Sequence, residues 1–265
     1  NVSDDTPLPP EIPHALNPPD GVIVDYWLGE RPKGEITPEV VDASGRVVRH
    51  LSSAPVPPLA EAPRVRFPEY WLARPKGMPT ATLTNRVNWD LRYDAPRVFE
   101  RDFEINANPG LTPPSPEGPL APPGTYTVRL TVDGARHEQK VAVKNDPRSP
   151  ATAADLQAQH GLLMGLYDAI NATWDSGQRA GALRAAVDQA ASGAPPEVMA
   201  SAAAFKTTLD AVIGGERPGP STFRGVSGAL SRQLVAQDKG DHAPTAPMLA
   251  AYAATCRDLS KVQTE

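Results

Sequence analysis

The chain has 265 residues, a formal net charge of −5, 40% hydrophobic and 22% charged residues, and a single cysteine. This length fits one large domain or two ordinary ones, and an acidic chain without a basic stripe excludes a nucleic-acid-binding surface. No apolar run approaches the roughly 20 residues that span a bilayer, and the single cysteine, Cys256, excludes an internal disulfide framework.

Prolines divide the chain near residue 147. Residues 1–150 hold 25 of the 31 prolines, and residues 151–265 hold the other 6. Because proline removes a backbone donor and breaks helix interiors, we predict strands and loops first and helices afterwards. The predicted domains are an extended arm over 1–20, a β-sandwich over 21–146 and a helical bundle over 147–265.

The arm over 1–20 is dense in proline and favours extended, polyproline-like chain. It is either a linker that arrives from an upstream region or an arm that lies along a partner surface. In the second case Pro9, Pro10 and Pro13 are candidate contact residues, because preset φ angles lower the entropy cost of docking.

Strands are predicted from β-rich runs and the turns between them. Residues 22–28 have strand composition. Residues 35–41 and 46–51 flank the turn Asp42-Ala43-Ser44-Gly45, which predicts a hairpin. A second hairpin is expected around Asp133-Gly134, between strands at 125–132 and 138–143.

The run from Arg86 to Tyr93 alternates apolar and polar residues, which predicts a strand with Trp89 and Leu91 on its buried face. Asp90 and Arg92 lie on the polar face, where a surface or cross-strand pair is favoured over a catalytic one. In the later strand, Tyr126 follows Pro122-Pro123-Gly124 closely, which resembles a tyrosine corner. The predicted structural core is Trp89, Leu91, Tyr126, Val128 and Leu130.

Two long proline-rich loops, over 53–80 and 94–121, interrupt the strands. Long loops in compact domains are often functional. In the first loop Phe67, Tyr70 and Trp71 either plug one end of the sheets or form a surface that stacks on a sugar or a partner protein. We take these aromatic residues, together with the prolines of the arm, as the candidate interaction surface.

Four helices are expected after Pro150. A seven-residue recurrence over 152–191 favours one long helix of ~40 residues, although Asp175-Ser176-Gly177 also permits a break. The second helix starts at Pro195-Pro196 and stops at Gly214-Gly215, Ser221 or Thr222 caps the third, and Thr245 caps the fourth. In the fourth, Leu249, Tyr252, Cys256 and Leu259 fall on one stripe.

These helices, joined by short loops, predict an up-and-down bundle. Their many alanines allow close approach and leave a thin core. Two interpretations stay open: a self-contained small bundle, or a helical layer that leans on another surface.

Reaction chemistry is not apparent in the residues. The five histidines are scattered, with no zinc spacing, and there is no phosphate-loop or nucleophile-elbow pattern. We therefore assign no catalytic residue, metal ligand or cofactor, and expect a protein that is not an enzyme.

A family resemblance rests on the order of several motifs. The start Asp4-Asp5-Thr6-Pro7-Leu8-Pro9-Pro10, the run Trp89-Asp90-Leu91-Arg92-Tyr93, the turn Ala121-Pro122-Pro123-Gly124-Thr125-Tyr126 and the helix start Thr152-Ala153-Ala154-Asp155-Leu156-Gln157 resemble the C-terminal region of bacterial BNR-repeat, sortilin-like β-propeller proteins. The β part also resembles the immunoglobulin-like module of flagellar hook-capping proteins and related fibronectin type III-like domains. The propeller itself, with its Asp-box signature, is missing from these residues.

The resemblance implies an immunoglobulin-like β-sandwich followed by helices, in an extracytoplasmic (periplasmic or secreted) protein. We expect a non-catalytic scaffold that docks on other proteins of a larger complex, for example as a membrane-extrinsic subunit of an envelope complex. The alternative is the accessory region of a secreted propeller hydrolase, which binds glycan or stabilises the propeller.

Overall fold

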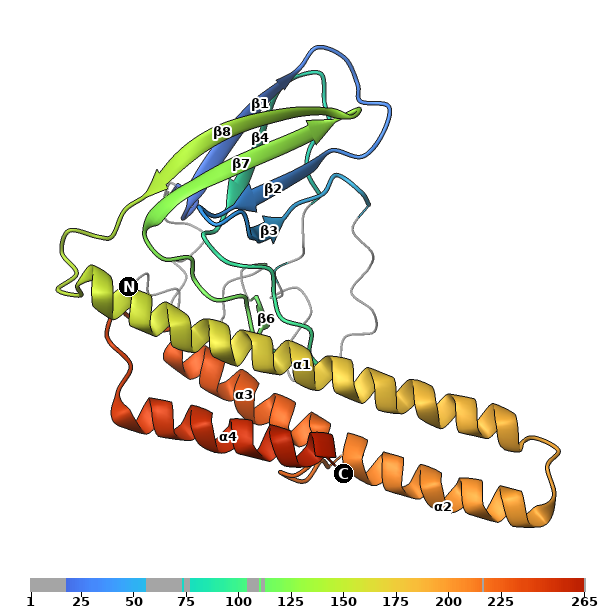
Figure 1. The fold of residues 1–265 in the computed structure, drawn as a ribbon. Helices are drawn as coiled ribbons and strands as arrows, with labels where there is room; N and C mark the ends of the chain where they lie inside the picture. Colours follow the sequence, from blue (N-terminus) through green and yellow to red (C-terminus); the bar gives the residue numbers. More distant parts are fainter. Residues whose placement is uncertain are drawn as a thin grey trace, which may run out of the picture. The chain divides into compact units, whose positions relative to one another are not determined.

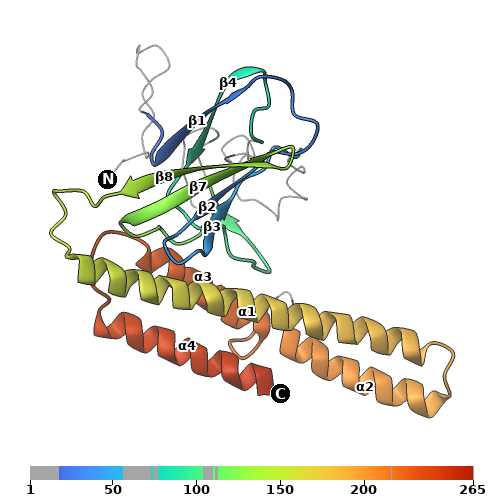
Figure 2. The ribbon, with the colours of Figure 1, turned by 45° about the horizontal axis from the view of Figure 1, so that its top comes forward.

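The computed structural model describes residues 18–55, 73, 77–103, 110, 113–215 and 217–264. The chain forms two compact units, a β unit (Asn1–Ala95 and Arg101–Ala153) and a helical unit (Pro96–Glu100 and Ala154–Glu265). Strands therefore come first and helices follow, as the proline distribution predicts (Figures 1 and 2).

All strand pairings in the β unit are antiparallel. One sheet has the strand order β1-β4, a second has the order β3-β2-β7-β8, and β5 pairs with β6. The strands are β1 (Val22–Leu28), β2 (Thr37–Val41), β3 (Val47–His50), β4 (Leu83–Trp89), β5 (Asp102–Phe103), β6 (Pro114–Ser115), β7 (Gly124–Val132) and β8 (Ala135–Val143).

Both predicted hairpins are confirmed, and local chemistry explains them. The Asp42 carboxylate accepts hydrogen bonds from the backbone N–H groups of Ser44 and Arg46, at 2.8 and 3.0 Å, which closes the β2–β3 turn. In the β7–β8 turn Asp133 and Gly134 have φ angles of 47° and 84°, the left-handed conformation that two-residue hairpins of this type require.

The strand predicted over Arg86–Tyr93 is wrong in its position. β4 starts at Leu83 and ends at Trp89, and Leu91, with a φ of 61°, lies half-buried in the turn that follows. The Asp90 carboxylate accepts the backbone N–H of Arg92 at 3.1 Å, so this carboxylate stabilises the turn. An alternating apolar and polar pattern does not reveal a single residue in the left-handed conformation, so the sequence predicts a strand that continues through this turn.

Trp89 joins the two larger sheets. Its side chain is 1% exposed, its Nε1 donates to the carbonyl oxygen of Arg92 at 3.0 Å, and its ring meets that of Tyr126 edge to face, with centroids 5.1 Å apart. Tyr126 and Val128 of β7 are also buried, and Leu130 is half-buried. Residues from different sheets thus share one core.

The Tyr126 hydroxyl donates to the carbonyl oxygen of Pro122 at 2.6 Å. This bond back to nearby backbone is the geometry that the Pro-Pro-Gly-x-Tyr pattern predicted. Burial raises the pKa of Tyr126 well above its ordinary value of 10, because the phenolate would lose its hydration inside the core.

We expect the stability of the β unit to decline above about pH 10, and the Tyr126→Phe variant to decline less steeply. In the unfolded chain the tyrosine ionises near pH 10, whereas in the folded protein it stays neutral. The unfolded state therefore releases its proton first, and a rise in pH above 10 stabilises the unfolded state relative to the folded one. Burial also raises the pKa of Tyr26, so the variant removes only part of the slope. Urea unfolding of both proteins across alkaline pH measures this, and parallel slopes would contradict it.

The helical unit contains four helices in the described residues: α1 (Ala153–Ala191), α2 (Pro196–Ile213), α3 (Phe223–Gln237) and α4 (Ala246–Thr264). α1 is unbroken over 39 residues, about 58 Å at 1.5 Å per residue, which settles the alternative in favour of one helix. The predicted caps of the next two helices are confirmed: Pro195 and Gly214 bound α2, and the Thr222 side chain accepts the N–H of Gly225.

α3 runs antiparallel to the first half of α1. Phe223, at its start, lies beside Gly177, and the carbonyl oxygen of Gln237, at its end, accepts a hydrogen bond from Gln159 Nε2 at 3.2 Å. This buried amide satisfies a carbonyl at the end of α3 that has no partner within its own helix.

α4 returns parallel to α1. Tyr252 lies against Gly165, where a Cβ would stand 2.6 Å from the tyrosine oxygen, and Gln263 Nε2 donates to Ser176 Oγ. Since α2 and α3 both run antiparallel to α1, one after the other, the order differs from a simple up-and-down bundle (Figures 1 and 2).

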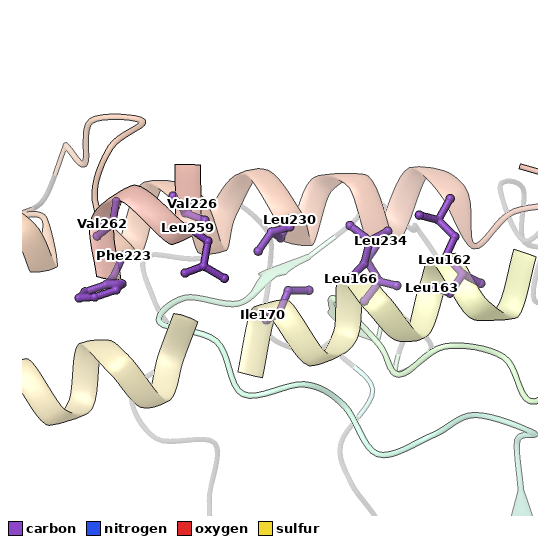
Figure 3. Packing of buried hydrophobic residues seen from close by; sticks show 10 residues of the cluster. All are labelled: Leu162, Leu163, Leu166, Ile170, Phe223, Val226, Leu230, Leu234, Leu259 and Val262. Atoms are coloured by element: carbon purple, nitrogen blue, oxygen red, sulfur yellow. The ribbon is translucent and has the colours of Figure 1, made fainter. Parts of the chain in front are cut away.

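The core of the helical unit lies where α3 and α4 cover the first half of α1. Figure 3 shows the ten side chains of this cluster, drawn from these three helices. They are Leu162, Leu163, Leu166, Ile170, Phe223, Val226, Leu230, Leu234, Leu259 and Val262. The predicted stripe of α4 is confirmed at the buried Leu259 and at Tyr252, which packs against this cluster, but it is wrong at Leu249, which is 49% exposed; Thr255 and Val262 are also buried.

The short segment Pro96–Glu100 packs within the helical unit. The Arg97 guanidinium makes a bidentate ion pair with Asp175, at 2.6 and 2.8 Å, and lies over the Trp174 ring. The Phe99 ring lies against Gly177, where an added Cβ would stand 2.3 Å from it. Gly177 is therefore a point of close packing, which explains a glycine inside an unbroken helix.

Candidate interaction surfaces

The interaction residues predicted from the sequence cannot be placed. Phe67, Tyr70 and Trp71, and Pro9, Pro10 and Pro13 of the arm, lie outside the described residues. The predicted core residues Trp89, Tyr126 and Val128 are buried as described above, and none of them is available to a ligand. Any surface argued from geometry therefore comes from other parts of the chain.

Charged residues form a row across the larger sheet. Glu39 of β2 faces His50 of β3 and Arg129 of β7, and Arg129 faces Glu138 of β8. Arg129 contacts Glu39 and Glu138 at 3.0 Å each, and its guanidinium lowers the pKa of the Glu138 carboxyl. Complementary charges at directly opposed positions fix the register of strands, so this row has a structural explanation.

The described ranges hold no cluster of three or more His, Cys, Asp and Glu side chains that could bind a metal ion. Asp94 accepts a hydrogen bond from His50 Nδ1 at 2.6 Å, but the same carboxylate also accepts the His50 backbone N–H. This pair ties the segment after β4 to β3.

None of the four described helices is long and apolar enough to cross a membrane. α2 nevertheless buries none of its 18 residues. It lies along the second half of α1 (Figure 1), and this pair of helices forms a hairpin that extends past α3 and α4. The hairpin is the part of the helical unit with the thinnest core.

Ion pairs hold the hairpin together along its seam. Arg184 of α1 contacts Asp210 of α2 at 2.6 Å, and Lys206 of α2 contacts Asp188 of α1. The hydrogen bond from Lys206 lowers the pKa of the Asp188 carboxyl. Val187 of α1 and Leu209 of α2, three residues after Arg184 and Lys206, are half-buried, whereas other apolar residues of the hairpin stay exposed.

Leu183, Val198 and Phe205 form one exposed apolar surface, which we call the hairpin face. Their exposed fractions are 47%, 49% and 45%. Leu183 precedes Arg184, and Phe205 precedes Lys206, each by one residue. When two helices run antiparallel, the residues that directly precede facing seam residues point to the same side of the helix pair. Val198 lies two turns before Phe205, on the same stripe.

The hairpin face carries one charged residue on the stripe of Leu183, the exposed Arg179 four residues before it. Its other positions, three or seven residues from those above, are Ala186, Ala190, Ser201 and Thr208. Met199 is 51% exposed but lies seven residues before Lys206, on the seam stripe of α2 and not on the stripe of Phe205. Exposed apolar residues on one side of a helix pair are typical of a surface that packs against another helix.

A second exposed apolar surface lies on β1. Ile23 and Trp27 are 41% and 67% exposed, and Asp25 lies between them on the same side of the strand. Asp25 makes a bidentate pair with Arg86 of β4, at 2.7 and 2.9 Å, which lowers the pKa of its carboxyl. The sequence pattern gave no signal for this side of β1, since its inward residues dominate the hydrophobic run.

Comparisons with protein-family models, with curated proteins and with solved structures find no match for this chain. The function is therefore argued from the two exposed surfaces and the folds that carry them.

Proposed function

We propose that this protein is a non-catalytic scaffold that docks on a larger protein assembly through the hairpin face. The β unit is an immunoglobulin-like sandwich in this proposal, supported by the strand order β3-β2-β7-β8 beside β1-β4 and by the Tyr126 corner. The family resemblance supports an extracytoplasmic location, with the protein as a membrane-extrinsic subunit of an envelope complex.

The observation that carries the proposal is that α2 buries none of its residues. α3 and α4 cover α1 up to about Gly177, whereas α2 is the one described helix that lies along the residues after it (Figures 1 and 2). A helix with an apolar stripe must bury it against another element. The hairpin face is therefore the place where a bundle lacks a further helix.

The expected occupant is a helix of a partner protein with an apolar, uncharged stripe. Leu183, Val198 and Phe205 offer it only apolar contact, and Ala186 and Ala190 permit a close approach of helix axes. A charged partner surface would lose its hydration against these apolar side chains. This arrangement is the helix-in-groove mode of recognition.

A photo-crosslinking amino acid at position 205, in the organism that makes the protein, tests this proposal. We expect a crosslinked adduct at 205 and much less at 199, because Met199 is as exposed but lies on the seam stripe, about 100° around α2 from the stripe of Phe205. The partner, identified by mass spectrometry, is then purified and mixed with the protein. Leu183→Glu with Phe205→Glu should weaken that binding at least about 100-fold, since two anchor residues are lost, whereas Met199→Glu should leave it within about 3-fold.

Three results would overturn the proposal. One is an equal yield of adduct at positions 199 and 205. Another is unchanged binding of the double variant to the purified partner. The third is a concentration-dependent dimer in light scattering that the double variant abolishes, because the hairpin face would then belong to a second copy of this chain.

A further inference from the structure

β1 has a hydrogen-bonding edge that no other described strand occupies. β4 is its only neighbour among the described residues, paired from Val22↔Trp89 to Leu28↔Leu83. In an antiparallel pair, every second residue directs its backbone N–H and C=O toward the partner, and the residues between direct theirs the other way. β1 therefore directs a row of backbone groups to a side on which no described strand pairs with them.

The edges at β8, β3 and β4 carry more of the features by which proteins discourage strand addition than the edge at β1 does. β8 places Arg136, Glu138 and Lys140 along its length and is exposed over most of it. β3 is short, and its edge is covered where the N–H of Asp94 donates to the carbonyl of Val48 at 3.0 Å.

β4 presents Thr84, Arg86 and Asn88 on its outward side, all polar. β1, in contrast, reads Val-Ile-Val-Asp-Tyr-Trp-Leu, with one charge. An apolar edge strand of seven residues is an aggregation hazard unless a second strand covers it. This contrast indicates that β1 is the edge at which a further strand is added.

We propose that the open edge of β1 binds an extended segment of another polypeptide, which adds a strand beside β1. The site is separate from the hairpin face, and the inference stands if the proposed function fails. The main-chain groups of β1 supply the affinity, and its outward side chains supply the specificity, as in other cases of strand addition.

The side chains of β1 define the chemistry of the added strand. The outward side reads Ile23, Asp25, Trp27, that is, apolar, acidic, apolar. Side chains directly opposite one another on neighbouring strands interact, so the complementary strand presents apolar, basic, apolar residues. Asp25 already pairs with Arg86 on its β4 side, and the basic residue approaches it from the other side.

The capped peptide Thr-Val-Thr-Lys-Thr-Val-Thr has this pattern and serves as the probe against the full chain. We expect it to slow hydrogen exchange of the β1 amides and not of the β8 amides. N-methylation of one alternate set of its residues should weaken binding at least about 10-fold, because a ladder of hydrogen bonds is lost. N-methylation of the other set, whose N–H groups point away, should leave binding within about 3-fold.

The charge specificity has its own control. Replacing the central lysine of the peptide with glutamate should weaken binding about 3- to 10-fold, and the Asp25→Asn variant should abolish this difference. The proposal is overturned if the peptide fails to bind, if both sets of N-methyl groups weaken binding equally, or if the lysine and glutamate peptides bind alike to the unaltered protein.

Other occupants of this edge give distinct results that would also overturn the proposal. If the chain's own residues 1–17 cover it, the β1 amides are already protected in the intact protein and lose protection when those residues are removed. If a second copy covers it, the protein dimerises and Trp27→Lys abolishes the dimer. If Trp27 stacks on a sugar, a glycan array gives hits that Trp27→Ala removes, while the peptide does not bind.

Discussion

Replacing Trp89 with alanine is expected to lower the free energy of unfolding of the β unit by about 3–5 kcal/mol, the range for buried aromatic residues. Trp89 is 1% exposed and meets Tyr126 of the other sheet edge to face. Its removal opens a cavity between the sheets, and also leaves the carbonyl oxygen of Arg92 without its hydrogen-bond donor. Hydrogen exchange of the β7 amides in the intact protein measures the loss.

Trp27→Ala is the matched control, since Trp27 lies on β1, beside β4, but is 67% exposed. We expect it to change stability by no more than about 0.5 kcal/mol. The milder Trp89→Phe keeps an aromatic ring and should cost less than the alanine variant. Comparable effects of Trp27→Ala and Trp89→Ala would show that Trp89 does not join the sheets.

Sequence reasoning succeeded where structure depends on neighbouring residues. The turns at Asp42–Gly45 and Asp133–Gly134 were predicted because side-chain acceptors and left-handed glycines act within four residues. The cap at Thr222 and the stop at Gly214 follow from the same local chemistry. The order of strands before helices follows from proline, whose effect is also local.

Sequence reasoning failed where distant residues decide the outcome. Leu91 was predicted on a strand because the alternation continues through it, but the chain turns there and the carbonyl oxygen of Leu91 accepts the N–H of Ala121, thirty residues later, at 2.7 Å. Leu249 was placed on a buried stripe because it has the right period, but the side of α4 that meets α1 and α3 lies one position away, at Met248. The Arg97 contacts with α1 join residues 78 positions apart, which periodicity does not detect.

The candidate surfaces were missed for a related reason. The sequence predicts an interaction surface from aromatic residues in loops, whereas the exposed apolar residues used above lie on helices and on a strand. In the hairpin, Leu183 and Phe205 look like core residues, because charged seam residues such as Arg184 and Lys206 normally mark a solvent face. The pattern could have been detected by noting that the seam itself pairs opposite charges.

In the helical unit, Leu230→Ala is expected to lower the free energy of unfolding by about 2–5 kcal/mol. Leu230 has no exposed surface and belongs to the cluster shared by α1, α3 and α4. Ile170 and Leu166 of α1 are equally buried on the facing side (Figure 3), so the removed atoms leave a cavity bounded by rigid helices. Chemical unfolding followed by far-ultraviolet circular dichroism measures the change, because the helices dominate that signal.

Leu249→Ala is the control that separates burial from helix propensity. Both variants place the same residue in a helix, where alanine is the best helix former, but Leu249 is 49% exposed and should change stability by at most about 0.5 kcal/mol. Equal effects at Leu230 and Leu249 would mean that the cluster of α1, α3 and α4 does not hold the unit together. In that case all four helices would be as thinly packed as the hairpin. The thin packing of the hairpin would then no longer indicate that it binds a partner.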